Sequence, residues 1–330
     1  MKIQFLGGAE EVGKLGLLLE ISNTKLLLDY GFTPGKPPKY PLESPEVDLA
    51  LLSHCHIDHS GMLPWLCRKY DTPIVSTCLT AWLTELLARD SLKVAKLEGY
   101  PIPFQKSDVR KMSENFNFIK YNEVIDFAGL EIKFHSSGHI PGSTMFEISG
   151  EKKLLFTSDL NTINTELVWG AHPVKCDYLF TEGTYAGREH QQRELVKKKF
   201  LAKIEEVVDR GGKVIIPVFA VGRAQEILLV LQNTHYSKWL DGMSKEVNLL
   251  MLEGAQYLRN AKVLKKAIAS TKIVRSETAR RRAIKDCEVI ITTSGMLDGG
   301  PVLEYIKKLN YEKNAILLTG YQVKGSNGRR

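Results

Sequence analysis

The chain has 330 residues, of which 43% are hydrophobic and 25% charged, and its formal net charge is +7. This composition is ordinary for a globular protein and supplies enough apolar residues for one large or two medium domains. No run of about 18 apolar residues occurs, which argues against a membrane-spanning helix.

Charge is distributed unevenly along the chain. Residues 1–183 carry 18 basic and 23 acidic side chains, a net charge of −5, whereas residues 184–330 carry 27 and 15, a net charge of +12. An acidic part suits cation binding or chemistry, and a basic part attracts a polyanion such as a nucleic acid. Lys-rich helices with solvated faces would give the same net charges. Charge alone therefore does not distinguish polyanion binding from ordinary solvated surface.

The first half is dominated by short β-favouring runs that end at Gly, Asn or Ser. We expect strands, interrupted by helices over 62–70 and 78–97, at 2–6, 16–22, 25–31, 47–53, 130–137, 143–149, 152–160 and 176–183. Many strands interleaved with a few helices predict a two-layered sheet arrangement with helices outside.

The pattern changes near residue 184. An amphipathic helix is expected over 191–212, closed by Gly211 and Gly212, and is followed by a strand, a helix, a strand, a helix and a strand at 213–219, 222–233, 287–294, 300–310 and 314–320. This alternation predicts a parallel α/β module. We therefore expect two domains, residues 1–183 and 184–330.

Five scattered cysteines form no CxxC pair. Their number and spacing favour free thiols in a reducing compartment. The first residues, "MKIQFLGGAEEVG", lack the apolar stretch of a secretory signal. We expect a cytoplasmic protein.

Residues 53–61, "SHCHIDHSG", concentrate three histidines and one aspartate. Imidazole and carboxylate groups both suit zinc. In an extended segment His54 and His56 share one face and can bind one ion, while Asp58 and His59 follow at the turn into a helix and face a neighbouring position. Two plus two ligands suggest two metal ions. Cys55, between two ligands on one face, is expected to point away and pack beneath the site.

Three residues outside this segment are further candidates for the same metal site. His139 lies in the Gly-flanked loop "SSGHIPGS", where it can be the third imidazole of one ion. Asp159 ends the predicted strand in "LLFTSDLN" and is a candidate bridge between two ions. Asp29, at the end of "KLLLDYG", is a candidate carboxylate that orients a ligand histidine.

These motifs resemble the metallo-β-lactamase fold, because "SHCHIDHSG", "LLLDYG", "SGHIPGS" and "FTSDL" match its signatures in order. The second half resembles the β-CASP nucleases, a family that includes RNase J and the nuclease subunit of the pre-mRNA 3′-end cleavage machinery, with archaeal members. The matching segments are "TEGTYAGREH", "PVFAVGRAQEIL", "TTSGMLDGGPV" and "LLTGYQVKGSNGRR". The resemblance implies an αββα sandwich with an inserted β-CASP α/β domain.

The resemblance also implies roles for individual residues. His54, His56 and His139 correspond to ligands of one zinc, Asp58 and His59 to ligands of the other, and Asp159 to the bridge. Glu182 stands at the acidic β-CASP motif, so the catalytic residues are expected to be Asp58, Asp159 and Glu182.

The family pattern includes two more histidines after the inserted domain, one a general acid and the other a ligand of the second zinc. Here no histidine follows His235. We expect a C-terminally truncated chain that lacks the final lactamase-domain strands and binds the second zinc weakly. An inactive fragment is one outcome that this truncation implies. A naturally short homologue is the alternative.

The implied function is a zinc-dependent ribonuclease, endonucleolytic or 5′–3′ exonucleolytic, acting in RNA processing or decay. A hydroxide bridging two Zn²⁺ ions would hydrolyse the phosphodiester and leave 5′-phosphate and 3′-hydroxyl ends. Single-stranded RNA is the expected partner, and a homodimer through the missing C-terminal region is possible in this family. A DNA-processing nuclease and a non-catalytic RNA-binding or scaffolding homologue are the alternatives. A thioesterase or lactamase would lack the basic α/β insert.

Several residues in the basic half are candidates for RNA contacts. These are Arg223, the turn of Ser294, Gly295 and Met296 through its backbone N–H groups, and Tyr321 by stacking. His190 is a candidate neighbour of the acidic motif. For each, a structural role in a turn, an ion pair or the core is an equal alternative. For Arg280, Arg281 and Arg282 a solvated helix face is favoured.

Overall fold

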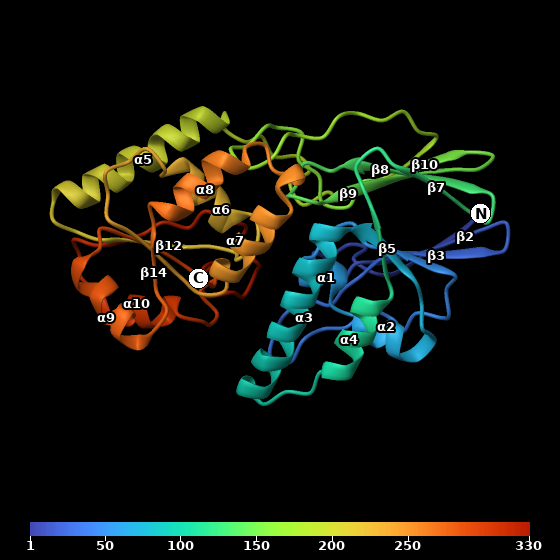
Figure 1. Cartoon of the computed structure of the whole chain (residues 1–330), viewed down its shortest axis with the longest axis horizontal. Helices are drawn as coiled ribbons and strands as arrows, with labels where there is room; N and C mark the ends of the chain where they lie inside the picture. Colours follow the sequence, from blue (N-terminus) through green and yellow to red (C-terminus); the bar gives the residue numbers. More distant parts are fainter. The chain divides into compact units, whose positions relative to one another are not determined.

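The computed structural model describes residues 1–330, which form two compact units (Figure 1). Unit 1 contains residues 1–164 and 168–184, and unit 2 contains residues 165–167 and 185–330. Each unit has its own sheets and its own hydrophobic core.

The first sheet of unit 1 has six strands in the order β1-β2-β3-β4-β5-β6. β1 to β3 pair antiparallel, and β3 to β6 pair parallel. Leucines alternate in register across the antiparallel part, with Leu17 opposite Leu28 and Leu19 opposite Leu26. The strands are β1 (Lys2–Gly7), β2 (Gly16–Ile21), β3 (Thr24–Tyr30), β4 (Leu49–Leu51), β5 (Ile74–Thr77) and β6 (Phe116–Ile119).

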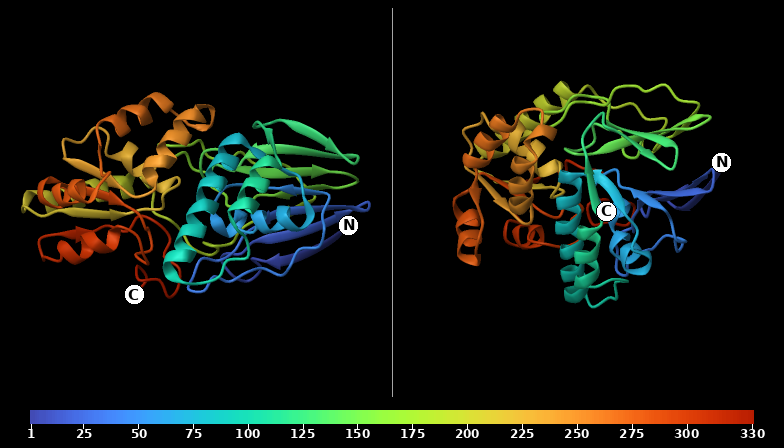
Figure 2. Two further views of the ribbon diagram at one scale, coloured as in Figure 1. Left: turned by 60° about the horizontal axis from the view of Figure 1, so that its bottom comes forward. Right: turned by 45° about the vertical axis from the view of Figure 1, so that its right-hand side comes forward.

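The second sheet of unit 1 has five strands in the order β11-β10-β9-β8-β7 and stacks on the first (Figure 2). Its inward side chains, such as Phe134 and Phe146, form one buried cluster with the leucines of β2 and β3, because strand side chains alternate between the two faces. The strands are β7 (Val124–Phe127), β8 (Leu130–Ser136), β9 (Thr144–Ser149), β10 (Lys153–Phe156) and β11 (Tyr178–Phe180).

Helices cover the outer face of the first sheet, where Trp65, Leu66 and Met112 join a second buried cluster. They are α1 (Ile57–Ser60), α2 (Leu63–Tyr70), α3 (Cys78–Glu98) and α4 (Lys106–Glu114). The hydroxyl of Thr77 caps the start of α3 by accepting a hydrogen bond from the N–H of Thr80. On the outer face of the second sheet, residues from the irregular segment 160–176 pack on β9 and β10.

Unit 2 is built on a five-stranded parallel sheet in the order β14-β13-β15-β12-β16. The strands are β12 (Val214–Pro217), β13 (Lys238–Asp241), β14 (Lys272–Ile273), β15 (Val289–Thr292) and β16 (Ala315–Ile316). Helices cover both faces, as the predicted strand and helix alternation requires (Figure 1). They are α5 (Arg193–Asp209), α6 (Arg223–Val230), α7 (Ser244–Glu253), the 3₁₀ turn Ala255–Tyr257, α8 (Ala261–Ala269), α9 (Glu277–Asp286) and α10 (Val302–Lys308).

Two sequence interpretations need correction in unit 2. The helix expected over 191–212 spans only Arg193–Asp209, and it buries only Ile204 and Val207 fully. Its apolar stripe is therefore narrower than an amphipathic helix implies. Arg280 does not belong to a solvated face, because its guanidinium is paired with the buried carboxylate of Asp241.

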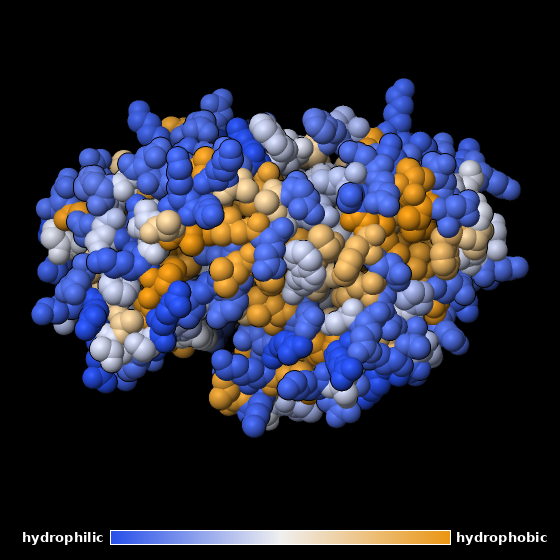
Figure 3. Space-filling view, in the orientation of Figure 1, coloured by the Kyte–Doolittle hydropathy of each residue, from blue (hydrophilic) through white to orange (hydrophobic).

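The surface is mixed in character. Figure 3 shows one face of the molecule, on which hydrophobic groups lie among hydrophilic ones. Leu97, near the end of α3, is an exposed apolar side chain. None of the helices is long and apolar enough to cross a bilayer.

Candidate functional site

The histidine-rich segment follows β4 and turns directly into α1. The turn is held by the end of β3, since the N–H of Phe32 donates to the carbonyl of Ile57 at 3.1 Å. Gly31 makes this approach possible, because a Cβ there would lie 1.9 Å from the carbonyl carbon of Asp58. The local sequence thus fixes the position of the backbone from which the side chains of Asp58 and His59 project.

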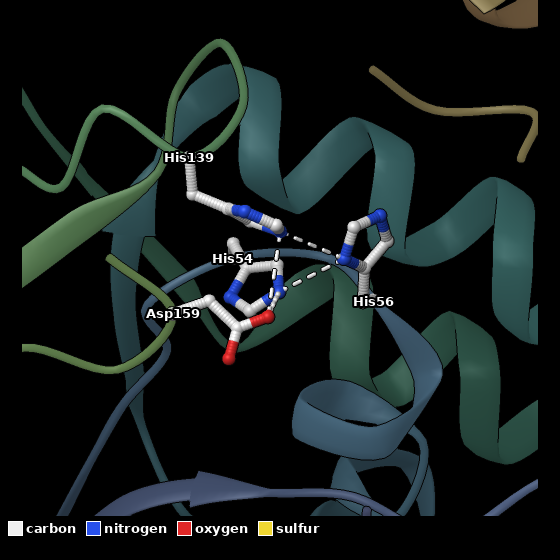
Figure 4. Close-up of side chains that lie close together, drawn as sticks. All are labelled: His54, His56, His139 and Asp159. Carbon is white, nitrogen blue, oxygen red and sulfur yellow. Dashed lines mark hydrogen bonds and ion pairs between the residues drawn. The ribbon is translucent and has the colours of Figure 1, made fainter. Parts of the chain in front are cut away.

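Four side chains converge at the ends of β4, β8 and β10 (Figure 4). His56 Nδ1 lies 3.1 Å from His54 Nε2 and 3.2 Å from His139 Nε2. Asp159 Oδ2 lies 3.4 Å from His139 Nε2 and 3.7 Å from His54 Nε2. The loop of His139 depends on Gly138, whose φ of +67° and closeness to the carbonyl of Asn161 both exclude a larger residue.

This geometry fits a metal ion. Zinc–nitrogen bonds of about 2.0–2.1 Å in a tetrahedron separate ligand atoms by about 3.3–3.4 Å. The four separations in the structure, 3.1 to 3.7 Å, bracket that value. Three ring nitrogens and one carboxylate oxygen therefore surround a position that suits one metal ion.

The environment favours the neutral form of two of these rings. Burial, reinforced by neighbouring histidines, lowers the pKa of His54 well below its ordinary value. Burial, together with the nearby His139, lowers the pKa of His56 to about 4. Neutral imidazole is the form that binds a metal ion, so both rings are ready to act as ligands at neutral pH.

A second group of ligand atoms lies beside the first. His59 Nε2 is 3.4 Å from Asp159 Oδ1 and 3.8 Å from Asp58 Oδ2. Burial disfavours charge on His59, but the carboxylates of Asp159 and Asp58 outweigh it and hold the pKa of His59 well above its ordinary value. Asp159 directs Oδ2 at the first group and Oδ1 at the second, which is the arrangement a bridging carboxylate needs.

Asp29 is close enough to His54 and His59 to be grouped with them as a possible ligand. Its oxygens already accept hydrogen bonds from the N–H and hydroxyl of Ser53, both at 2.7 Å, and from Ser158 Oγ at 3.0 Å. His59 Nδ1 lies 2.8 Å from Asp29 Oδ2. With these donors filling its lone pairs, Asp29 orients His59 and leaves Nε2 of that ring free to bind a metal.

Two hydroxyl residues of this network were not predicted from the sequence. Ser53 Oγ lies 3.0 Å from His54 Nδ1 and 2.7 Å from Ser158 Oγ, so the two serines connect the rings of His54 and His59 through Asp29. Their only sequence signal is that each directly precedes a candidate ligand. Cys55, as predicted, is fully buried; burial raises the pKa of its thiol, and it belongs to neither ligand group.

Glu182 and His190 lie in different surroundings from the ligand groups. Glu182, at the end of unit 1, is exposed, and its Oε2 accepts a hydrogen bond from the N–H of Thr184 at 3.0 Å. His190, in unit 2, is exposed, and its ring contacts that of Tyr185 at a centroid distance of 4.5 Å.

The candidate RNA contacts of unit 2 gather at the carboxyl edge of its parallel sheet. Arg223 begins α6 after β12, and Ser294 to Met296 follow β15, the neighbouring strand. From β12 the chain crosses to β13 on one side, and from β15 it crosses to β16 on the other. Such a reversal in strand order opens a crevice that commonly binds ligands in α/β folds.

Donors without acceptors line this edge. The backbone N–H groups of Ser294, Gly295 and Met296 donate no hydrogen bond within the chain, and neither does the guanidinium of half-buried Arg223. The turn is held in place by Gln322 Nε2, which donates to the carbonyl of Gly295 at 2.9 Å. Adjacent N–H groups and a cation without a partner suit an anion such as phosphate.

The fold and the ligand geometry define a metal-binding hydrolase site of the metallo-β-lactamase type. A metallo-beta-lactamase superfamily domain model matches residues 18–175, and a Beta-Casp domain model matches residues 201–330. The chain belongs to the β-CASP family of the metallo-β-lactamase superfamily, as the sequence motifs predicted.

Archaeal relatives match the chain over its whole length. It is 39% identical to Probable RNase MJ4 of Methanocaldococcus jannaschii, over all of this chain and 81% of that protein. RNase aCSPSF2 of Saccharolobus solfataricus is 37% identical over 99% of this chain and 68% of its own length. Transcription termination factor FttA of M. jannaschii is 34% identical, and the chain spans 57% of its length.

Proposed function

We propose that the protein is a zinc-dependent ribonuclease that hydrolyses single-stranded RNA in RNA processing or decay in the cytoplasm. The observation that carries this proposal is the pair of ligand groups that share Asp159, each group facing a different oxygen of one carboxylate. The relatives named as RNases support RNA as the substrate. Five free cysteines agree with a reducing compartment.

Zinc, when bound, would lower the pKa of a coordinated water and neutralise charge on the scissile phosphate. His54, His56, His139 and Asp159 would hold one ion, and Asp58, His59 and Asp159 the other. Asp29 would then keep the ring of His59 in one orientation and the proton on Nδ1. Because water is the nucleophile, the 2′-hydroxyl takes no part, and the products carry 5′-phosphate and 3′-hydroxyl ends.

Unit 2 would bind the RNA backbone. Its residues include most of the segment whose net charge is +12, which attracts a polyanion over a long range. Arg223 and the N–H groups of Ser294, Gly295 and Met296 would contact phosphate, and Tyr321 would contact a base.

The first test is metal content together with product chemistry. We expect about two zinc ions per chain at saturation, one bound tightly and one more weakly. Cleavage of 5′-labelled single-stranded RNA should stop after chelation and return with zinc. Zinc is counted by atomic emission, and the product ends are identified by mass spectrometry.

Two outcomes contradict the proposal. Products with 2′,3′-cyclic phosphate ends would show that the 2′-hydroxyl is the nucleophile. A protein that holds zinc and binds RNA but cuts neither RNA nor single-stranded DNA would be a binding protein instead of an enzyme. Faster cleavage of DNA than of RNA would assign the protein to DNA processing.

We further propose that Glu182 takes part in proton transfer during cleavage. One of its oxygens accepts from Thr184, and the exposed carboxylate has no other partner within the chain. The substitution Glu182→Gln should lower kcat by about 10²-fold, the smaller of the usual effects of losing acid–base catalysis. Zinc content should not change, because Glu182 belongs to neither ligand group.

Glu189→Gln is the matched control for this prediction. Glu189 is exposed, lies seven positions further along the chain and makes no hydrogen bond or ion pair. Its variant should cleave RNA at the unchanged rate. Equal losses in the two variants, or loss of zinc from Glu182→Gln, would refute the role of Glu182.

A further inference from the structure

Three aromatic side chains of unit 2 are in contact at the protein surface. The ring of Tyr185 meets that of His190 at 4.5 Å and 81°, and that of Tyr321 at 5.9 Å and 88°. Tyr185 is 40% exposed and Tyr321 36%, and neither hydroxyl makes a hydrogen bond within the chain. A right-angled pair covers at most one face of one ring, so ring faces remain available to a ligand.

The segment that carries Tyr321 is tied to the loops at the carboxyl edge of the sheet. Gly320 lies against the ring of Phe219, which follows β12, and Gln322 donates to the carbonyl of Gly295, which follows β15. Tyr321 stands between these two anchored residues. The aromatic cluster therefore adjoins the turn whose backbone N–H groups have no acceptor.

A cation without a partner lies near the same cluster. Glu226 is fully engaged, because it pairs with Arg193 and accepts from the backbone N–H groups of Glu166 and Leu167. Arg223 consequently has no carboxylate partner. Burial lowers the pKa of Arg223, and Glu226, Arg193 and Tyr185 are the charged or titratable groups close enough to influence it. An unpaired guanidinium beside exposed rings suits a phosphate attached to a stacked base.

We propose that Tyr185, His190 and Tyr321 form a stacking platform for a nucleobase of single-stranded RNA, next to the phosphate contacts of Arg223 and the Ser294–Met296 turn. A duplex keeps its bases stacked on one another, so only an unpaired strand can offer a base to these rings. Stacking accepts every base and implies little sequence preference. This inference rests on the proposed RNA-binding function and assigns it a second kind of contact.

The test measures binding of a phosphorothioate oligouridylate of about 12 nucleotides, a length near the usual site size, to the zinc-loaded protein. Stacking contributes about 1–3 kcal/mol per base, so Tyr185→Ala and Tyr321→Ala should each raise Kd by roughly 5- to 150-fold. Tyr185→Phe keeps the ring and should bind normally. An abasic oligonucleotide with the same backbone should bind the tyrosine variants and the unsubstituted protein equally.

Tyr311→Ala is the matched control, because Tyr311 is 64% exposed in the same unit and contacts no other ring. It should bind the oligouridylate like the unsubstituted protein, and thermal melting curves establish that each variant is folded. Arg223→Ala should weaken binding of the normal and the abasic oligonucleotides alike.

Each other result has a defined meaning. Normal affinity in Tyr185→Ala and Tyr321→Ala, with loss in Arg223→Ala, would overturn the platform while RNA binding stands. Equal losses for normal and abasic strands would also overturn it, because the rings would then not stack on a base. If the unsubstituted protein binds no oligouridylate, the RNA-binding function itself fails, and an exposed aromatic cluster that docks another protein becomes the explanation.

Discussion

Asp159→Asn should abolish zinc binding at both positions and lower RNA cleavage by at least about a thousandfold, because the activated water depends on bound metal. Asp159 is the only residue whose two oxygens face both ligand groups, Oδ2 toward His54 and His139 and Oδ1 toward His59. The amide keeps the size of the side chain but loses the charge that two cations would share. Zinc per chain and the single-turnover cleavage rate are the measurements.

Asp177→Asn provides the control for this substitution. Asp177 precedes β11 and accepts a hydrogen bond from the N–H of Lys153 at 2.8 Å, at the start of β10. Asp159 follows the other end of β10, so the two carboxylates lie at opposite ends of one strand. Asp177→Asn should keep both zinc ions. Retention of a full complement of zinc by Asp159→Asn would contradict the shared-carboxylate arrangement.

The substitution His54→Ala distinguishes the two zinc positions from each other. It removes a ligand atom from the first group only, since His54 Nε2 faces His56 Nδ1 and Asp159 Oδ2. The same substitution also breaks the contact with Ser53 Oγ, one of the donors to Asp29. Its effect on zinc binding should therefore exceed that of a substitution at Asp58 or His59, the two residues that belong to the second group alone.

The ligand segment could be predicted from the sequence because its four candidate ligands are neighbours along the chain. His54, His56, Asp58 and His59 are close along the chain, and the period of an extended segment sets which of them share a face. His139 and Asp159 were predicted from their positions at a Gly-flanked loop and a strand end, and the structure brings both to His54 and His56. The family resemblance supplied the pairing between the segments.

Contacts between distant segments could not be predicted in the same way. Ser53 and Ser158 are 105 positions apart, and no pattern in the sequence indicates that their hydroxyls meet at Asp29. Short or irregular elements were also missed, including α4 and β6, because a run of nine or four residues gives a weak periodic signal. Whether such short elements form depends on their pairing and packing with distant segments, and the local residue propensities do not show this.

The contact between Arg280 and Asp241 in unit 2 also joins distant segments and could not be predicted from the sequence. This contact gives a second expected result. Arg280→Ala should destabilise unit 2 by about 3 kcal/mol, the lower end of the cost of leaving a buried charge without its partner. Arg280 Nε lies 2.7 Å from Asp241 Oδ2, and the hydroxyl of Tyr305 donates to the same oxygen at 2.9 Å. Asp241 is 3% exposed, so water cannot replace the lost guanidinium. Calorimetry should show the melting midpoint lowered by roughly 6–12 °C.

The neighbouring arginine gives the comparison. Arg281 is on the same helix, α9, but its side chain is 74% exposed and its nitrogen lies 3.6 Å from Glu277. An exposed pair of this kind contributes about 0–1 kcal/mol, so Arg281→Ala should melt almost normally. Hydrogen exchange in β13 and β15 should accelerate only in Arg280→Ala, because Asp241 ends β13, which pairs with β15.

A double variant distinguishes loss of packing from loss of charge pairing. If the uncompensated carboxylate causes the instability, Arg280→Ala combined with Asp241→Asn should recover part of it, because the buried charge is then absent. If Arg280 stabilises mainly through its apolar stem, the double variant should be no more stable than Arg280→Ala. The hydroxyl of Tyr305 can still donate to the amide oxygen of the substituted residue, so the pairing of α10 with the end of β13 persists in the double variant. Partial recovery would therefore assign the role of Arg280 to neutralising a carboxylate at the same sheet edge that presents Arg223, and no recovery would refute that role.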